Sequence, residues 1–113
     1  MENRQFHRLL LRVDITHHLK SAPKVSKSWT KDISRGGICI TTCDEPLLVH
    51  EIYIMKFSLP DIKKQIKAQG MVVCTRKYIE GIAVFYDNGI EFTKLRKKYR
   101  KLIEDYSIGS INL

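Results

Sequence analysis

The stretch Asp32-Ile-Ser-Arg-Gly-Gly37 joins two short segments, 29–33 and 38–43, that are predicted to be strands. Two adjacent glycines indicate a turn with either positive φ or close backbone approach. Asp32 and Ser34 are two residues apart, so at a strand end their side chains point to the same face. Such a carboxylate and hydroxyl can bind a polar ligand, but they can equally cap the turn through its own backbone.

The segments around this turn predict further strands. Between residues 9 and 19 apolar residues occupy alternate positions and polar residues the others, which indicates one half-buried strand. Residues 20–28 read as a loop or ragged edge, and strands are predicted at 50–59, 66–79 and 82–92. Gly70 marks a bend, and Asn88-Gly89 marks either a hairpin turn or a bulge.

Residues 93–106 change to a helical period. Their apolar side chains recur at positions that share one face of a helix: Leu95, Tyr99, Leu102, Ile103 and Tyr106. Residues 107–113 are predicted to be a frayed tail. About six strands followed by one helix, without βαβ alternation, predict a mainly β fold: a six-stranded antiparallel (split) β-barrel with a C-terminal α-helix.

Composition narrows the function classes. The chain has 113 residues and a net charge of +8, and six cations between Lys94 and Lys101 leave only +2 for the rest. The basicity is therefore concentrated in the helix, and a uniformly basic nucleic-acid surface is not indicated. The helix could be a solvated face, a docking surface for an acidic partner, or a nucleic-acid contact.

Compartment and cysteine chemistry are also predicted. No apolar run approaches the ~20 residues of a membrane span, and the N-terminus lacks a signal-peptide pattern, so we expect a cytoplasmic location. Cys39, Cys43 and Cys74 form an odd set without a CxxC pair, and we expect small buried or half-buried thiols.

A second motif, Arg4-Gln-Phe-His-Arg8, lies near the N-terminus. Arginine carries a planar fork that grips phosphate or the O6/N7 edge of guanine, and it can stack on a base. A spacing of four on a flexible arm allows Arg4 and Arg8 to converge on one ligand. Alone, RxxxR more often belongs to an exposed basic tail without a specific role.

Together these motifs resemble the PilZ domain, the bacterial receptor module for cyclic di-GMP. The family pattern is RxxxR near the start followed by (D/N)xSxxG, and every fixed position is filled, by Arg4, Arg8, Asp32, Ser34 and Gly37. Gly-Ile-Glu-Phe at 89–92 also looks like the family's last strand, so the resemblance covers nearly the whole chain. It implies a six-stranded antiparallel barrel with a helix, in agreement with the pattern of the residues.

The resemblance also implies residue roles. Arg4 and Arg8 would clamp guanine and phosphate of cyclic di-GMP, and Asp32 and Ser34 would hydrogen-bond one guanine. Gly36 and Gly37 would keep that wall of the site thin. Family members often carry a third arginine within RxxxR, where this chain has Gln5, and Arg35 could compensate for its absence.

The remaining candidates are weaker. Trp29 precedes the motif and could stack on a base, although a core or interface role is more common. His17 and His18 are adjacent, so on a strand they face opposite sides and cannot chelate one metal. We find no nucleophile–base pair, phosphate loop with lysine, or metal-ligand cluster, and we expect neither an enzyme nor a cofactor.

The resulting hypothesis is a cyclic di-GMP receptor that acts through a downstream protein partner. Residues 1–8 would be a flexible arginine arm, 9–92 the barrel and 93–106 a basic amphipathic helix. The arm would close over the ligand and change the surface shown to the partner. Two alternatives remain: a PilZ-like interaction module that needs no ligand, and a small barrel that binds single-stranded nucleic acid.

Overall fold

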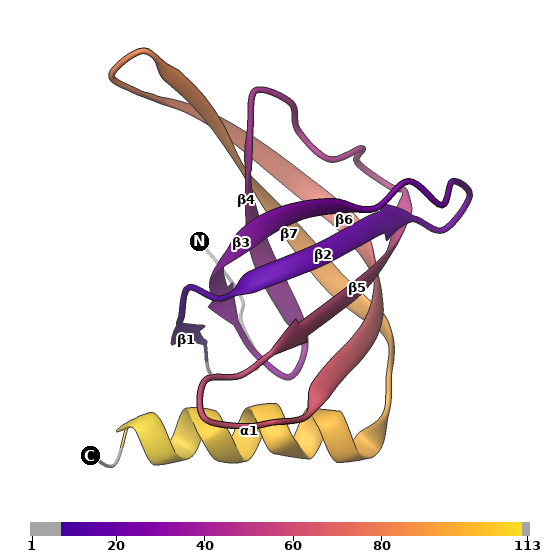
Figure 1. Cartoon of the computed structure of the whole chain (residues 1–113), viewed down its shortest axis with the longest axis vertical. Coiled ribbons are helices and arrows are strands. Elements are labelled where there is room, and N and C mark those ends of the chain that lie inside the picture. Colours follow the sequence, from indigo (N-terminus) through magenta and orange to yellow (C-terminus); the bar gives the residue numbers. More distant parts are fainter. Residues whose placement is uncertain (1–7, 112–113) are drawn as a thin grey trace.

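The fold is known from a computed structural model, which describes residues 8–111 and the side chains of residues 8–107. Seven strands precede one helix: β1 (Leu9–Leu10), β2 (Asp14–Leu19), β3 (Ser26–Ile33), β4 (Gly37–Cys43), β5 (Ile52–Ser58), β6 (Gln65–Glu80), β7 (Ala83–Leu95) and α1 (Lys97–Ile111). Figure 1 shows α1 lying across one end of the strands, while the β6–β7 hairpin extends from the other end.

The strands form a closed antiparallel barrel, as the sequence predicts. The sheet order is β1-β3-β2-β5-β6-β7-β4, and an additional β3–β4 pairing closes the ring of six strands. β1 adds two residues to β3 outside this ring, with Leu10 opposite Asp32. The turn between β3 and β4 therefore lies at the seam where the barrel closes, beside the start of the chain's first strand.

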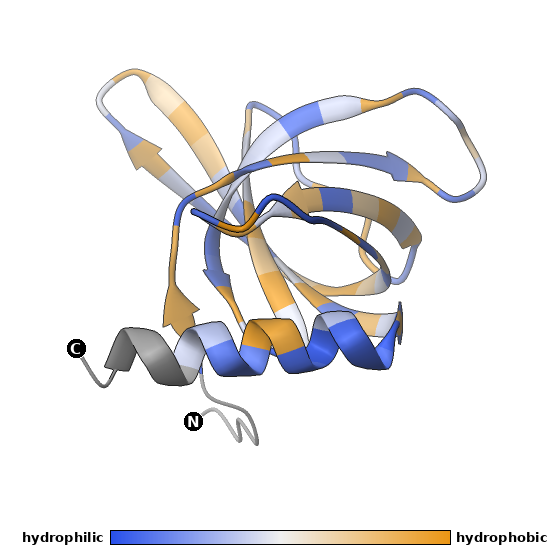
Figure 2. Cartoon of the chain, turned by 60° about the horizontal axis from the view of Figure 1, so that its bottom comes forward, coloured by the Kyte–Doolittle hydropathy of each residue, from blue (hydrophilic) through white to orange (hydrophobic). Residues whose placement is uncertain are grey.

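Alternation along the strands places the core inside the barrel. Ile15, Ile40, Met55 and Ile66 are almost fully buried and come from four different strands. Ile103 of α1 is 2% exposed, and Tyr99 and Leu102 pack beside it against the same core. Figure 2 shows the apolar middle of α1 between polar stretches, so the helix covers this end of the barrel with its apolar residues.

The prediction of one strand over 9–19 is wrong, because the chain breaks into β1 and β2. The break contains Leu11 and Val13, and the side chain of Thr30 bridges it. The Thr30 hydroxyl donates to the Leu11 carbonyl at 2.6 Å and accepts from the Val13 amide at 2.9 Å. Thr30 is fully buried, so its hydroxyl supplies hydrogen bonds that a continuous strand would take from its neighbour.

Replacing this hydroxyl is expected to be costly. Thr30→Val keeps the shape but leaves the Leu11 carbonyl and the Val13 amide each without this partner, so we expect a loss of about 1–3 kcal/mol of unfolding free energy. Urea denaturation checks this value. Thr93→Val is the matched control, because the Thr93 hydroxyl donates to the Gln69 carbonyl at an exposed position. Equal effects of the two substitutions would contradict the bridging role of Thr30.

Other strands also differ from their predicted bounds, and strand pairing explains the differences. β3 begins at Ser26 rather than Trp29, because residues 26–29 pair with β2. β7 runs unbroken through Asn88 and Gly89, so the hairpin interpretation is wrong. The register instead shifts between Val72 and Cys74 of β6, opposite this dipeptide. A second shift, between Gln69 and Gly70, confirms the irregularity predicted at Gly70.

The helix begins and ends later than predicted. Residues 93–95 belong to β7, because Leu95 pairs with Ala68 of β6 and faces the core as a strand residue. The helix starts at Lys97, and the Arg96 carbonyl accepts from the amides of Tyr99 and Arg100. α1 continues to Ile111, so the prediction of a frayed tail over 107–113 is wrong for residues 107–111.

Candidate functional site

The Asp32–Gly37 motif forms the β3–β4 turn, and Ser34 organises that turn. The Ser34 hydroxyl oxygen accepts from the amides of Gly36 and Gly37, both at 3.2 Å. The Ser34 amide donates to the Gly37 carbonyl at 2.8 Å. The local interpretation of Ser34 therefore holds: its oxygen caps the turn. Its own proton points to the Gly37 carbonyl over 3.4 Å, which is too long for a strong hydrogen bond.

Gly37 is required by the close approach of two strands. A Cβ atom at this position would lie 2.4 Å from the carbonyl oxygen of Ile90 on β7, which is backbone and cannot move independently. The Gly36 carbonyl accepts from the Phe92 amide at 3.0 Å, which ties the turn to β7 as well. Of the two explanations for the glycines, the structure supports close approach at Gly37.

Arg8 and Asp32 form an ion pair at the edge of this turn. An Arg8 guanidinium nitrogen donates to Oδ1 of Asp32 at 2.5 Å, and the Asp32 side chain is only 9% exposed. The β1–β3 register positions this pair, because Leu9 lies opposite Ile33. Among the described residues, none donates a hydrogen bond to the second carboxylate oxygen of Asp32. Arg8 is partly exposed beside this carboxylate.

A second ion pair continues the same outer face. Lys31 donates to Oδ2 of Asp87 at 2.7 Å, and the Thr41 hydroxyl donates to Oδ1 at 3.0 Å. This hydrogen bond to Asp87 raises the pKa of Lys31. Neither Lys31 nor Asp87 was predicted as a site residue. The only signal in the sequence is that Asp87 directly precedes Asn88-Gly89.

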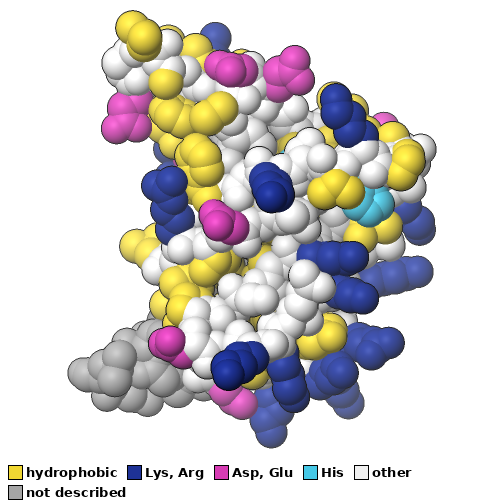
Figure 3. Space-filling view, in the orientation of Figure 1, with side chains coloured by type: hydrophobic (Ala, Val, Ile, Leu, Met, Phe, Trp, Pro, Cys, Tyr) yellow, Lys and Arg dark blue, Asp and Glu magenta, His cyan; other side chains and the backbone are white. Residues whose placement is uncertain are grey.

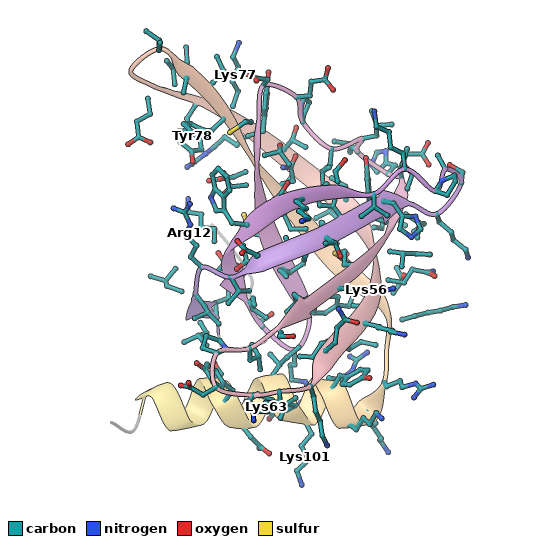
Figure 4. All side chains as sticks on the ribbon, in the orientation of Figure 1. Arg12, Lys56, Lys63, Lys77, Tyr78 and Lys101 are labelled. Atoms are coloured by element: carbon teal, nitrogen blue, oxygen red, sulfur yellow. The ribbon has the colours of Figure 1, made fainter. Side chains whose placement is uncertain are left out.

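Trp29 belongs to an aromatic stack on the outside of the barrel. The Arg12 guanidinium lies 4.6 Å from the centre of the Trp29 ring, within cation–π range. The Trp29 ring meets Phe85 edge-on at 6.2 Å, and Phe85 stacks on Tyr78 at 5.5 Å. Figure 4 shows Arg12 and Tyr78 on the same side of the molecule. The side chain of Trp29 therefore lies outside the core, near the residues of the turn.

Arg35 connects the turn to α1. Its guanidinium donates to Oε2 of Glu104 at 3.1 Å. Arg35 and Glu104 are both partly exposed, so this is a surface ion pair of small energetic weight. The helix is nevertheless in direct contact with the motif.

Cys39 of β4 lies beneath the two carboxylates. Burial, followed by the nearby charges of Asp32 and Asp87, raises the pKa of its thiol to about 12. The thiol is therefore protonated at neutral pH and presents a small, uncharged side chain. The expectation of buried or half-buried thiols is right for Cys39 and wrong for Cys43 and Cys74, which are exposed.

The structure brings most of the predicted residues to one place. Arg8 and Asp32 are paired, Ser34 and Gly37 shape the adjoining turn, and Arg35 leaves it toward α1. Trp29 lies further along the same outer surface. Arg4 and Gln5 lie outside the described residues, so the convergence of both arginines stays a prediction. Together, the described groups form a surface with guanidinium donors, a carboxylate, and a turn whose backbone lies close to β7.

The PilZ domain model matches residues 2–109. The chain belongs to the PilZ domain family. No curated protein matches the chain. Within the described residues, no helix is long and apolar enough to cross a membrane.

Solved structures share the fold at low sequence identity. The inhibitor of motility MotI/DgrA from Bacillus subtilis is similar with a TM-score of 0.79 and 18% identity, over 97% of this chain and 52% of that chain. The PilZ domain of YcgR from Escherichia coli, solved with c-di-GMP, has a TM-score of 0.74 and 12% identity, over 96% and 91%. PlzA from Borreliella burgdorferi, in complex with c-di-GMP, has a TM-score of 0.62 and 15% identity, over 89% and 47%. This chain therefore spans about half the length of MotI/DgrA and of PlzA.

Proposed function

We propose that this protein is a cytoplasmic receptor for cyclic di-GMP that acts by binding and not by catalysis. The observation that carries the proposal is the Arg8–Asp32 pair beside the Ser34 turn, within a PilZ domain. Cyclic di-GMP has two anionic phosphates and two guanines, so it needs cationic forks, a carboxylate and close backbone approach. Similar folds in YcgR and PlzA are known with this ligand.

In the proposed complex each group has a separate role. Arg8 grips a phosphate or the acceptor edge of a guanine, and the second oxygen of Asp32 accepts from guanine N–H groups. The Ser34 oxygen keeps its hydrogen bonds within the turn. The Ser34 hydroxyl proton, whose contact with the Gly37 carbonyl is long, is donated to the ligand. Arg4 closes from the arm, with Gln5 in the slot that often holds a third arginine. Gly36 and Gly37 give the ligand access to the backbone, and Arg35 and Trp29 are auxiliary contacts.

Ligand binding would then be signalled to a protein partner by a change in the surface of the receptor. An arm that orders over the ligand covers part of the barrel and presents its own side chains to a protein partner. Ordering the arm costs conformational entropy, so the measured affinity is the surplus after that cost. The alternatives, a module that needs no ligand and a single-stranded nucleic-acid binder, predict no saturable binding of cyclic di-GMP.

Calorimetric titration tests the receptor proposal. We expect saturable binding of cyclic di-GMP to the purified protein, with a stoichiometry of either one ligand or a stacked pair. Cyclic di-AMP is the matched control ligand, because it retains both phosphates and replaces the guanine edges that Arg8 and Asp32 would read. Equal affinity for both dinucleotides, or no binding of either at high protein concentration, would overturn the proposal.

A further inference from the structure

A row of cations crosses the outside of the barrel over β3, β5 and β6 and reaches the end of β7. The register places Lys27 of β3 opposite Thr16 of β2, Thr16 opposite Lys56 of β5, and Lys56 opposite Lys67 of β6. Leu95 of β7 pairs with Ala68 of β6. Because the two strands are antiparallel, Arg96, which follows Leu95, comes beside Lys67, which precedes Ala68. Residues directly opposite one another share a face. We define the cation row as Lys27, Lys56, Lys67 and Arg96, all of which are exposed.

This arrangement opposes the stability of the sheet. Lys56 and Lys67 are a directly opposed pair of like charges, which is destabilising in an antiparallel sheet. No carboxylate of the described residues forms an ion pair with any member of the cation row. By contrast, Lys31 of the neighbouring face is paired with Asp87. Figure 3 shows lysine and arginine side chains gathered along the β5, β6 and α1 side of the molecule.

An open groove of about 620 Å³ lies at the Lys27 and Lys56 end of the cation row. Lys27, Thr16 and Lys56 line it, and Trp29 provides one aromatic wall. Asp14 is the carboxylate in its lining, and it precedes Thr16 by two residues on β2. The groove therefore offers two lysine side chains, one carboxylate and one large ring that a partner can contact.

A row of cations can bind a polyanion, and the residues around the row indicate which kind it fits. Single-stranded nucleic acid needs several aromatic side chains for its bases, but the groove lining offers the Trp29 indole and Phe57, which is 2% exposed in the core. None of the strongly exposed apolar residues lines the groove, so it lacks side chains that could insert into a bilayer. Carboxylates on a folded protein surface match isolated lysine charges without bases that must stack or acyl chains that must insert.

The spacing of the row matches one face of an α-helix. Strands are ~4.8 Å apart, so Lys56, Lys67 and Arg96 follow Lys27 at roughly 10, 14 and 19 Å. Residues i+7, i+11 and i+14 of a helix follow residue i at roughly 10.5, 16.5 and 21 Å, and all four lie in one stripe. These spacings are measured along the curved outside of the barrel, so a straight helix faces the middle of the row directly, and the long side chains at the two ends bend toward it to pair.

We propose that the cation row is the docking surface for an acidic helix of a partner protein, with carboxylates at i, i+7, i+11 and i+14. The cation row contains none of the residues proposed to contact cyclic di-GMP, so docking of the helix does not depend on the ligand. Trp29 borders both surfaces, because it lines the groove and also stacks with Arg12 and Phe85. An interface of this kind is small and mainly electrostatic, as in transient regulatory complexes.

The test is the binding of two labelled helical peptides of ~20 residues. One peptide carries Glu at i, i+7, i+11 and i+14, and the other has the same composition with Glu distributed around the helix. Fluorescence anisotropy with the full chain is expected to show at least ~10-fold tighter binding of the first peptide. Lys56→Glu/Lys67→Glu is expected to remove this preference. It keeps a like-charge pair between β5 and β6, so its folding should resemble that of the wild-type protein.

Lys63→Glu/Lys101→Glu is the matched control variant. It makes the same charge change at exposed residues near α1, while Lys56 lies on the strands above them (Figure 4). This variant should keep the preference for the first peptide. Equal binding of the two peptides, or equal losses in the two variants, would overturn the proposal. Tighter binding to duplex DNA, or to phosphatidylcholine vesicles with phosphatidylglycerol, would also overturn it in favour of a phosphate surface.

Discussion

Arg8→Ala is expected to bind cyclic di-GMP at least ~100-fold more weakly than the wild-type protein. The substitution removes the cationic fork proposed to contact the ligand. It also leaves the Asp32 carboxylate, 9% exposed, without the cation that holds it in place. A carboxylate that is no longer paired repels the dianionic ligand as well. Calorimetry measures the affinity directly, and a thermal melt beside it reports whether the variant folds.

Two further variants distinguish geometry from charge. Arg8→Lys keeps the positive charge but loses the planar fork, so it should bind with an affinity between those of Arg8→Ala and wild type. Lys20→Ala removes one exposed cation after β2 and should bind as wild type does. If Arg8→Ala bound within about threefold of wild type, a difference of only ~0.7 kcal/mol, Arg8 would have no direct role in binding.

Gly37→Ala is expected to lower the free energy of unfolding by about 3 kcal/mol or more. The added Cβ would lie 2.4 Å from the Ile90 carbonyl oxygen, so β4 and β7 must separate at the point where the barrel closes. The Ser34 turn would move with β4, because the Ser34 oxygen accepts from the Gly37 amide. Urea denaturation measures the loss of stability.

Gly89→Ala provides the comparison for this substitution. Its Cβ would approach the Cys74 sulfur at 2.9 Å, and Cys74 is an exposed side chain that can rotate away. We therefore expect a loss below ~1.5 kcal/mol. If Gly89→Ala were as destabilising as Gly37→Ala, the carbonyl of Ile90 would not be the reason that position 37 requires glycine.

The sequence predicted most of the fold because alternation and turn residues are local signals. It failed where a distant residue decides the structure. Thr30 interrupts the first strand at Leu11 and Val13, and nothing in residues 9–19 reveals a hydroxyl that arrives from β3. Similarly, Leu95 fits a helical period, but its pairing with Ala68 keeps it in β7.

The site was predictable to the extent that its residues form short motifs. Asp32, Ser34 and Gly37 stood out by their spacing, and the structure joins Arg8 to Asp32. The Lys31–Asp87 pair was missed because its members lie on β3 and β7, far apart in the sequence. The cation row was missed for the same reason: a net charge of only +2 outside the helix region conceals lysines that the register aligns.

The opposed lysines at 56 and 67 form a frustrated contact in an otherwise consistent sheet. Counter-ions screen exposed like charges, so added salt relieves this repulsion and, through this contact, stabilises the folded state. The same ions weaken attraction to an acidic helix. Ionic strength thus moves folding and docking in opposite directions at this surface. Lys56→Glu alone would reverse the first effect, because it turns the repulsion into an attraction that salt weakens.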